Sequence, residues 1–153
     1  MGYGYAIWIL LTEPDILNLV DENNANIYYP HVTIRCNLTY SDAKKLYKDI
    51  LDFNSVLFVD THSGYEIFDF KYKNEDEHAA SGVFVDVESW EHLQKISKRY
   101  NGSDVITPHI TLAYRDDIDE LPLHIELSKR KISGKVVIAN TTSDDPEKWT
   151  LLT

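Results

Sequence analysis

Two short segments of the sequence combine residue types that can move protons and hold an oxyanion. They are Pro30–Ile34 and Pro108–Leu112, and each reads Pro-His-apolar-Thr-apolar. Histidine is the side chain whose unperturbed pKa lies near neutrality, so one neutral and one protonated histidine can act as base and acid. Threonine hydroxyls can donate hydrogen bonds to phosphoryl oxygens as negative charge builds on them. The pair of motifs therefore predicts cleavage of a phosphodiester bond without a metal.

The spacing of two residues between histidine and threonine is that of one face of a β-strand. Successive side chains of a strand point to opposite faces, so His31 shares a face with Thr33, and His109 shares a face with Thr111. The members of each pair then lie roughly 6–7 Å apart. Either histidine alone is more simply a structural residue of its strand. Two matched copies instead favour a functional cleft that all four polar side chains line.

Strand and helix patterns alternate along the chain, and the order strand, helix, motif strand occurs in each half. Helices are expected at Ala43–Leu51, with Ser41 as N-cap, and at Trp90–Tyr100, with Ser89 as N-cap. Strands are expected at 3–12, 28–38, 56–59, 65–72, 83–87, 109–114, 124–130, 135–139 and 149–152, with a short helix or turn through Leu19, loops at 21–26 and 73–78, and a hairpin turn at Ser133-Gly134.

This order predicts an α+β fold in one domain that spans residues 1–153. No linker rich in proline, glycine or serine separates the two halves. We expect a mostly antiparallel sheet, in one or two lobes, with the helices on its outer faces.

Composition limits the kind of partner. The chain is 43% hydrophobic and carries a formal net charge of −10. Non-specific grip on a nucleic-acid duplex requires a basic face, so we expect no such binding and favour a small anionic ligand held by local donors. The apolar run Ala6–Leu11 is too short for a membrane span and has no basic segment before it, so we expect a cytoplasmic protein with no membrane contact.

Cofactor and redox signals are missing from the sequence. The single cysteine, Cys36, permits no intramolecular disulfide, and it is more simply a small buried strand residue than a reactive thiol. No histidine or cysteine spacing typical of zinc sites occurs, and no glycine-rich phosphate loop or serine-nucleophile motif occurs. We therefore expect neither a metal nor a cofactor.

The paired motifs His31-Val32-Thr33 and His109-Ile110-Thr111 resemble those of the 2H phosphoesterase (LigT-like) superfamily. The resemblance implies a bilobal α+β fold with a pseudo-twofold internal repeat, and it implies that these four polar residues are catalytic without a metal. The family acts on 2′,3′-cyclic phosphates, RNA ends, 2′-5′ oligoadenylates and cyclic nucleotides. In size the chain is similar to phage anti-CBASS phosphodiesterases, which implies a viral protein that cleaves cyclic di- or oligonucleotide messengers in the host cytosol to evade immune signalling.

Three further residues are candidates for binding such a substrate. Tyr5 resembles the aromatic residue that the family carries on its first strand, and Trp149 lies in a polar late segment where a core role is harder to explain. Either ring offers a flat face on which a base can stack. Arg35 falls on the histidine face by alternation, and Arg115 also does so if its strand extends that far. Either guanidinium can contact a phosphate or simply be a solvated strand end.

Two other functions fit the same residues. One is an RNA-end enzyme that opens 2′,3′-cyclic phosphates or cleaves 2′-5′ linkages. The other is a non-catalytic nucleotide-binding module in which the histidines act only as hydrogen-bond donors.

Overall fold

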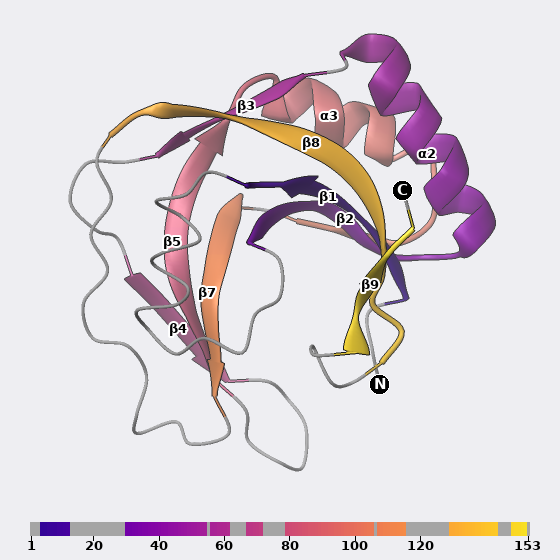
Figure 1. Ribbon diagram of the computed structural model, residues 1–153. Coiled ribbons are helices and arrows are strands. Elements are labelled where there is room, and N and C mark those ends of the chain that lie inside the picture. The colour runs from indigo at the N-terminus through magenta and orange to yellow at the C-terminus, as the bar shows by residue number, and fades with distance from the viewer. Residues whose placement is uncertain are drawn as a thin grey trace.

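In a computed structural model, the structure describes residues 4–12, 30–54, 56–61, 67–71, 79–105, 107–115, 129–143 and 148–152, with only the backbone described at 67–71, 79–82 and 111–115. The elements are β1 (Tyr5–Leu10), β2 (His31–Leu38), α2 (Tyr40–Phe53), β3 (Leu57–Thr61), β4 (Ile67–Lys71), β5 (Ala79–Val87), α3 (Trp90–Ser97), β6 (Ser103–Asp104), β7 (His109–Arg115), β8 (Lys131–Asn140) and β9 (Thr150–Leu151) (Figure 1).

The described strands form one antiparallel system, and the predicted α+β class is confirmed. Strands pair in the order β1-β2-β7-β5-β3-β8, and β8 pairs back onto β1. These pairings close a barrel of six strands, with β4, β6 and β9 attached to β5, β2 and β8. Strands from both halves of the chain are intermixed in this ring, so within the described residues the halves share one barrel. Because the ring is closed, each of the six strands pairs with a neighbouring strand on both sides.

Strand β8 makes the closure possible because it serves two neighbours in succession. Its first part pairs with β3 up to Gly134, opposite Leu57, and its second part pairs with β1 from Lys135, opposite Leu10. Figure 1 shows it arching from β3 across β1 towards β9. A Cβ atom built on Gly134 would lie 2.1 Å from Cγ2 of Ile9, so only glycine allows this close approach. The predicted hairpin turn at Ser133-Gly134 is therefore wrong, since both residues lie inside one continuous strand.

The main core lies between one face of the strands and the two helices. It joins buried side chains of β1, β2, β3, β5, β7 and β8 with Ala43, Leu46 and Ile50 of α2 and Leu93 and Ile96 of α3. Both helices lie together on the same side of the sheet (Figure 1). The two predicted helices are confirmed.

The helix N-termini differ in detail from the predicted caps. Helix α2 begins one residue after Thr39, whose hydroxyl accepts a 3.2 Å hydrogen bond from the backbone N–H of Asp42. Thr39, rather than the predicted Ser41, is thus the N-cap, because a cap must lie before the first helical residue. Ser89 does occupy the N-cap of α3, but its φ of 62° places it in the left-handed region and its side chain makes no capping hydrogen bond.

A second, smaller cluster lies on the opposite face of β1 and β8. It consists of Ala6, Trp8, Val137, Ala139 and Trp149. Strand β1 is therefore buried on both faces, which explains why its sequence is apolar throughout instead of alternating. The face that carries Trp8 is the one on which the histidine motifs lie, as described below.

Several predicted segments fall outside the described residues. They are the short helix or turn through Leu19, the loops at 21–26 and 73–78, and most of the strand expected at 124–130. Neither helix in the described part of the chain has the length and hydropathy needed to cross a membrane.

The two helices are tied together by a hydrogen bond between Tyr100 and Asp49. The Tyr100 hydroxyl, just beyond α3, donates to the Asp49 carboxylate in α2. This hydrogen bond is the main reason why the pKa of Tyr100 rises from 10.0 to about 12, and burial adds to it. The native state thus stabilises the neutral phenol.

This tie predicts a specific alkaline sensitivity. Because the folded pKa of Tyr100 is raised, the stabilisation is fully present below pH 10 and is lost as the pH rises towards 12. Tyr100→Phe should therefore unfold more easily than the wild type at neutral pH, and the difference should shrink over that alkaline range. Chemical denaturation at a series of pH values measures it, with Tyr47→Phe as the control. A difference that stayed constant up to pH 12 would contradict the assignment.

Candidate active site

The two histidine motifs lie on neighbouring antiparallel strands. Strands β2 and β7 are paired at Val32 and Ile110, which are the middle residues of the two motifs. Both side chains are fully buried in the main core, with 0% exposure. Strand alternation therefore turns His31 and His109 to the opposite face of the sheet. In this register the two histidines are diagonal neighbours, at about 7–8 Å, a distance that a phosphate group can bridge.

The same register brings each threonine next to the histidine of the other motif. When the antiparallel pairing is continued by one residue on either side of the Val32–Ile110 pair, His31 lies opposite Thr111 and Thr33 lies opposite His109. Thr33 is partly buried. The Thr111 backbone lies in β7 opposite Gly82 of β5, and its side chain falls outside the described residues. The four predicted polar residues thus occupy one small patch of register positions across two strands.

The imidazole of His31 is held by an aromatic contact that the sequence analysis did not identify. His31 is only 7% exposed, and its ring lies flat on the indole of Trp8, with 3.5 Å between ring centroids and 12° between planes. Trp8 is in β1, directly opposite Thr33 of β2. The alternation of the first strand carried a signal for this placement, because it sets Ala6, Trp8 and Leu10 on the face away from Ile7 and Ile9.

The other histidine is oriented by the backbone. Nδ1 of His109 lies 2.9 Å from the carbonyl oxygen of Thr107. A carbonyl oxygen can only accept, so Nδ1 must carry the proton and donate it to this hydrogen bond. In the neutral ring Nε2 then bears the lone pair, which is the tautomer that a general base needs at that atom.

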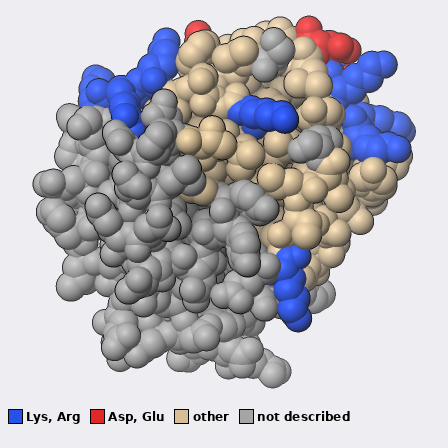
Figure 2. Space-filling view, viewed as in Figure 1, with Lys and Arg blue, Asp and Glu red and all other residues tan. Residues whose placement is uncertain are grey.

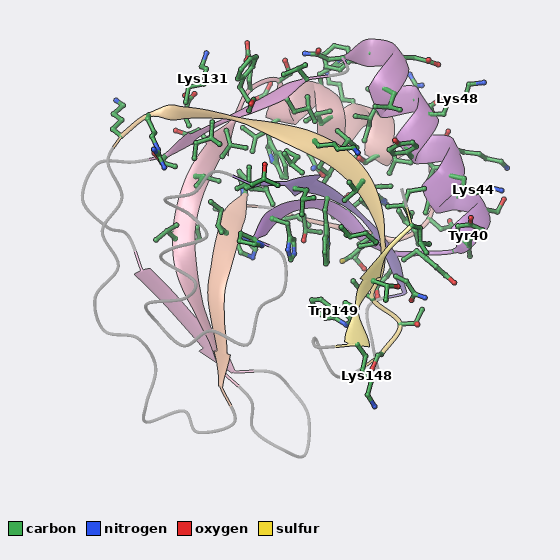
Figure 3. The ribbon with its side chains drawn as sticks, viewed as in Figure 1. Tyr40, Lys44, Lys48, Lys131, Lys148 and Trp149 are labelled. Carbon is green, nitrogen blue, oxygen red and sulfur yellow. The ribbon has the colours of Figure 1, made fainter. Side chains whose placement is uncertain are left out.

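Trp149 lies near this patch but is used for packing. Its ring contacts Trp8 at 5.9 Å between centroids, with 58° between planes, and its Nε1 donates a 2.8 Å hydrogen bond to the carbonyl of Ser143. Figure 3 shows Trp149 at the start of β9, close to β8. With 9% of its surface exposed, the indole offers little face to a base. Its predicted role as a stacking surface is replaced by support of Trp8.

Tyr5 lies on the other face of β1. It packs against the main core, and its ring contacts the exposed Tyr40 at the start of α2, with 5.2 Å between centroids. Figure 3 shows Tyr40 beside Lys44 on this helix, whose ammonium lies 5.0 Å from the Tyr40 ring. Tyr5 is thus on the face of β1 that faces away from His31, and its predicted role in stacking a base stays a prediction.

Arg35 is a structural residue of the core boundary. Its guanidinium donates 3.0 Å hydrogen bonds to the carbonyls of Asn101 and Tyr100, a 3.3 Å hydrogen bond to the carbonyl of Gly102, and a charged hydrogen bond to Asp104. The residue is 5% exposed. The predicted contact with a phosphate is therefore not supported, because these donors are spent on the turn that follows α3. The side chain of Arg115, in β7, falls outside the described residues.

Lys and Arg side chains lie at several separate places on the described surface, although the whole chain has a net charge of −10. Figure 2 shows them as scattered groups on one face, most of whose described surface is formed by other residues, with Asp and Glu near its upper edge.

Metal-binding and thiol groups add little to this site. In the part of the chain that the structure describes, no three His, Cys, Asp or Glu side chains gather in a group able to hold a metal ion. Burial raises the pKa of the Cys36 thiol, and the neighbouring Arg35 opposes this effect. A thiol with a raised pKa is a poor nucleophile, in keeping with a packing role for Cys36.

No protein-family model matches this chain, and neither does any curated protein. The features of this protein that bear on its function are the two motifs, their register across β2 and β7, and the groups that orient the two imidazoles.

The placement of Arg35 yields a test that separates a structural role from a phosphate-binding role. Arg35→Met should lower the free energy of unfolding by roughly 2–3 kcal/mol, because three carbonyls and a carboxylate lose a donor. Denaturant titration measures this change. The control is Arg99→Met: Arg99 is 66% exposed and 3.9 Å from Asp49, so a change within about 0.5 kcal/mol is expected. Wild-type stability for Arg35→Met would contradict the structural role.

Proposed function

We propose that this protein is a metal-independent phosphodiesterase of the two-histidine type that cleaves small cyclic di- or oligonucleotides. The observation that carries the proposal is the pairing of Val32 with Ile110, which sets His31 and His109 on one face of two adjacent strands. Two imidazoles at a diagonal spacing of about 7–8 Å suit general acid and base catalysis on a single phosphate.

The chemistry needs one proton acceptor and one proton donor. A neutral imidazole takes the proton of the attacking hydroxyl as its oxygen bonds to phosphorus, and an imidazolium gives a proton to the oxygen that leaves. Thr33 and Thr111 supply hydroxyl donors for the non-bridging oxygens, where charge builds. Where the cleaved linkage has a neighbouring 2′-hydroxyl, that group can attack and form a 2′,3′-cyclic phosphate.

A small cyclic substrate is favoured by charge and by the resemblance to 2H phosphoesterases. The net charge of −10 disfavours a long nucleic acid, whereas a small anion can be held by a few local hydrogen-bond donors. Similarity in size to phage enzymes that destroy cyclic oligonucleotide signals extends the proposal to evasion of nucleotide-based immunity in a host cell.

The activity is tested with the purified protein in excess EDTA. Cyclic dinucleotides and trinucleotides are incubated with it, alongside oligoribonucleotides with 2′,3′-cyclic ends or 2′-5′ linkages, and the products are identified by mass spectrometry. We expect linear products from at least one cyclic substrate. Cleavage of the oligoribonucleotides alone would favour the RNA-end enzyme. Intact substrates throughout would overturn the proposal.

The histidines provide the second test. His31→Ala and His109→Ala should each reduce kcat by about 10²–10⁴-fold, because each removes a proton-transfer group. Thermal unfolding and nucleotide binding by calorimetry check that the variants still fold and bind. His92→Ala is the matched control, since His92 is an exposed histidine of α3 that contacts Phe53. Undiminished turnover in both motif variants would refute catalysis by these residues and leave a binding module.

A further inference from the structure

The stacked contact between Trp8 and His31 bears on the protonation state of this histidine. The rings are nearly parallel and lie face to face, with 3.5 Å between centroids and 12° between planes. Neutral aromatic pairs prefer offset or edge-to-face arrangements, whereas a cation is attracted to the face of an indole. The geometry therefore suits a protonated imidazole on Trp8 better than a neutral one.

We propose that Trp8 is a positioning residue that fixes the ring plane of His31 and stabilises its imidazolium, making His31 the proton donor and His109 the proton acceptor. The inference rests on the proposed phosphodiesterase function and adds to it the roles of the two imidazoles. The Nδ1–H of His109 is held by the Thr107 carbonyl, which leaves the lone pair of the neutral ring on Nε2, the atom that would accept the proton.

Trp8 is well placed to hold one orientation. It is 2% exposed, it lies in the middle of β1, and β1 pairs with β2 on one side and β8 on the other. Trp149 packs against it at a tilt from beside β9. Close packing limits the rotation of a side chain enclosed in this way, and the imidazole stacked on it is restrained in turn.

The protons balance over the cleavage step. Nε2 of His109 accepts the proton of the attacking hydroxyl as the new O–P bond forms, and the His31 imidazolium donates its proton to the oxygen of the breaking P–O bond. His31 is then neutral and His109 is protonated. Exchange with water restores both forms before the next turnover.

Other charged groups near His31 must be considered in its titration. In the described residues, three more titratable side chains lie on the same face. They are His109, diagonal to His31 on β7, Lys135 of β8, which pairs with Leu10 opposite His31, and Cys36 of β2, which packs against the small cluster that contains Trp8. None of them is replaced when Trp8 is substituted, so a shift caused by that substitution reports on the stack.

The test follows the imidazole protons by NMR through a pH titration of the wild type, Trp8→Phe and Trp8→Leu. In the wild type the His31 ring proton should be shifted upfield by the indole ring current. In Trp8→Leu that shift should vanish and His31 should titrate at lower pH. Trp8→Phe, which keeps an aromatic face and the core packing, should lie between the two.

Kinetics provide the second readout. Trp8→Leu should lower kcat by about tenfold with little change in KM, and the alkaline limb of the pH–rate profile should move to lower pH. Trp90→Leu is the matched control: Trp90 is a partly buried tryptophan of α3 that packs against the main core, so its loss should affect stability alone.

An unchanged His31 titration in both Trp8 variants overturns the inference, and so does a pH–rate profile in which only the acidic limb moves. The NMR result stands without any turnover. If the protein cleaves no nucleotide but the His31 titration still shifts in the Trp8 variants, the proposed function is refuted. The stabilisation of the His31 imidazolium by Trp8 is then still supported.

Discussion

The site depends on the pairing of Val32 with Ile110. These two side chains are fully buried, so the core fixes which face of β2 and β7 points inward. A slip of one residue in either strand would exchange its faces, exposing an apolar side chain and burying a histidine. Burial of two aliphatic residues thus sets the register, and the register sets the spacing of His31 and His109. Fold stability and site geometry come from the same contact.

The two faces of strand β1 have different roles: one packs in the main core with Val32 and Ile110, and the other carries the tryptophan that stacks on His31. One face of β1 contributes Ile7 and Ile9 to the main core, and the other contributes Trp8 to the small cluster under His31. Because both faces are covered, β1 has little freedom to shift, and neither does the ring that stacks on it. Strand β8 locks the arrangement by closing the barrel, which it can do only because Gly134 lets Ile9 approach.

The buried cation Arg35 stabilises the fold by binding the turn that follows α3. Arg35 is two residues beyond Thr33, and alternation alone would keep it on the histidine face. The pairing of β1 with β2 shifts register on both sides of Ile7, so regular alternation does not carry through to Arg35. Its guanidinium instead satisfies the carbonyls of the turn after α3, groups that would otherwise lack donors. The turn is thereby fixed to the same strand that carries His31.

The sequence alone determined the local features of this protein. The spacing in Pro30–Ile34 and Pro108–Leu112 specified strands with polar and apolar faces, because the period of a strand is two residues. Apolar spacing likewise specified both helices and most strands, since each must bury one side. The α+β class followed from their order.

Only the tertiary structure decided which strands became neighbours and what each side chain met there. It brought β2 next to β7, stacked Trp8 on His31, turned Tyr5 to the opposite face and enclosed Arg35. In the tertiary structure the segment that contains the turn-like Ser133-Gly134 pair is also one continuous strand, β8. These outcomes depend on contacts between residues far apart in the chain, and no local period encodes them.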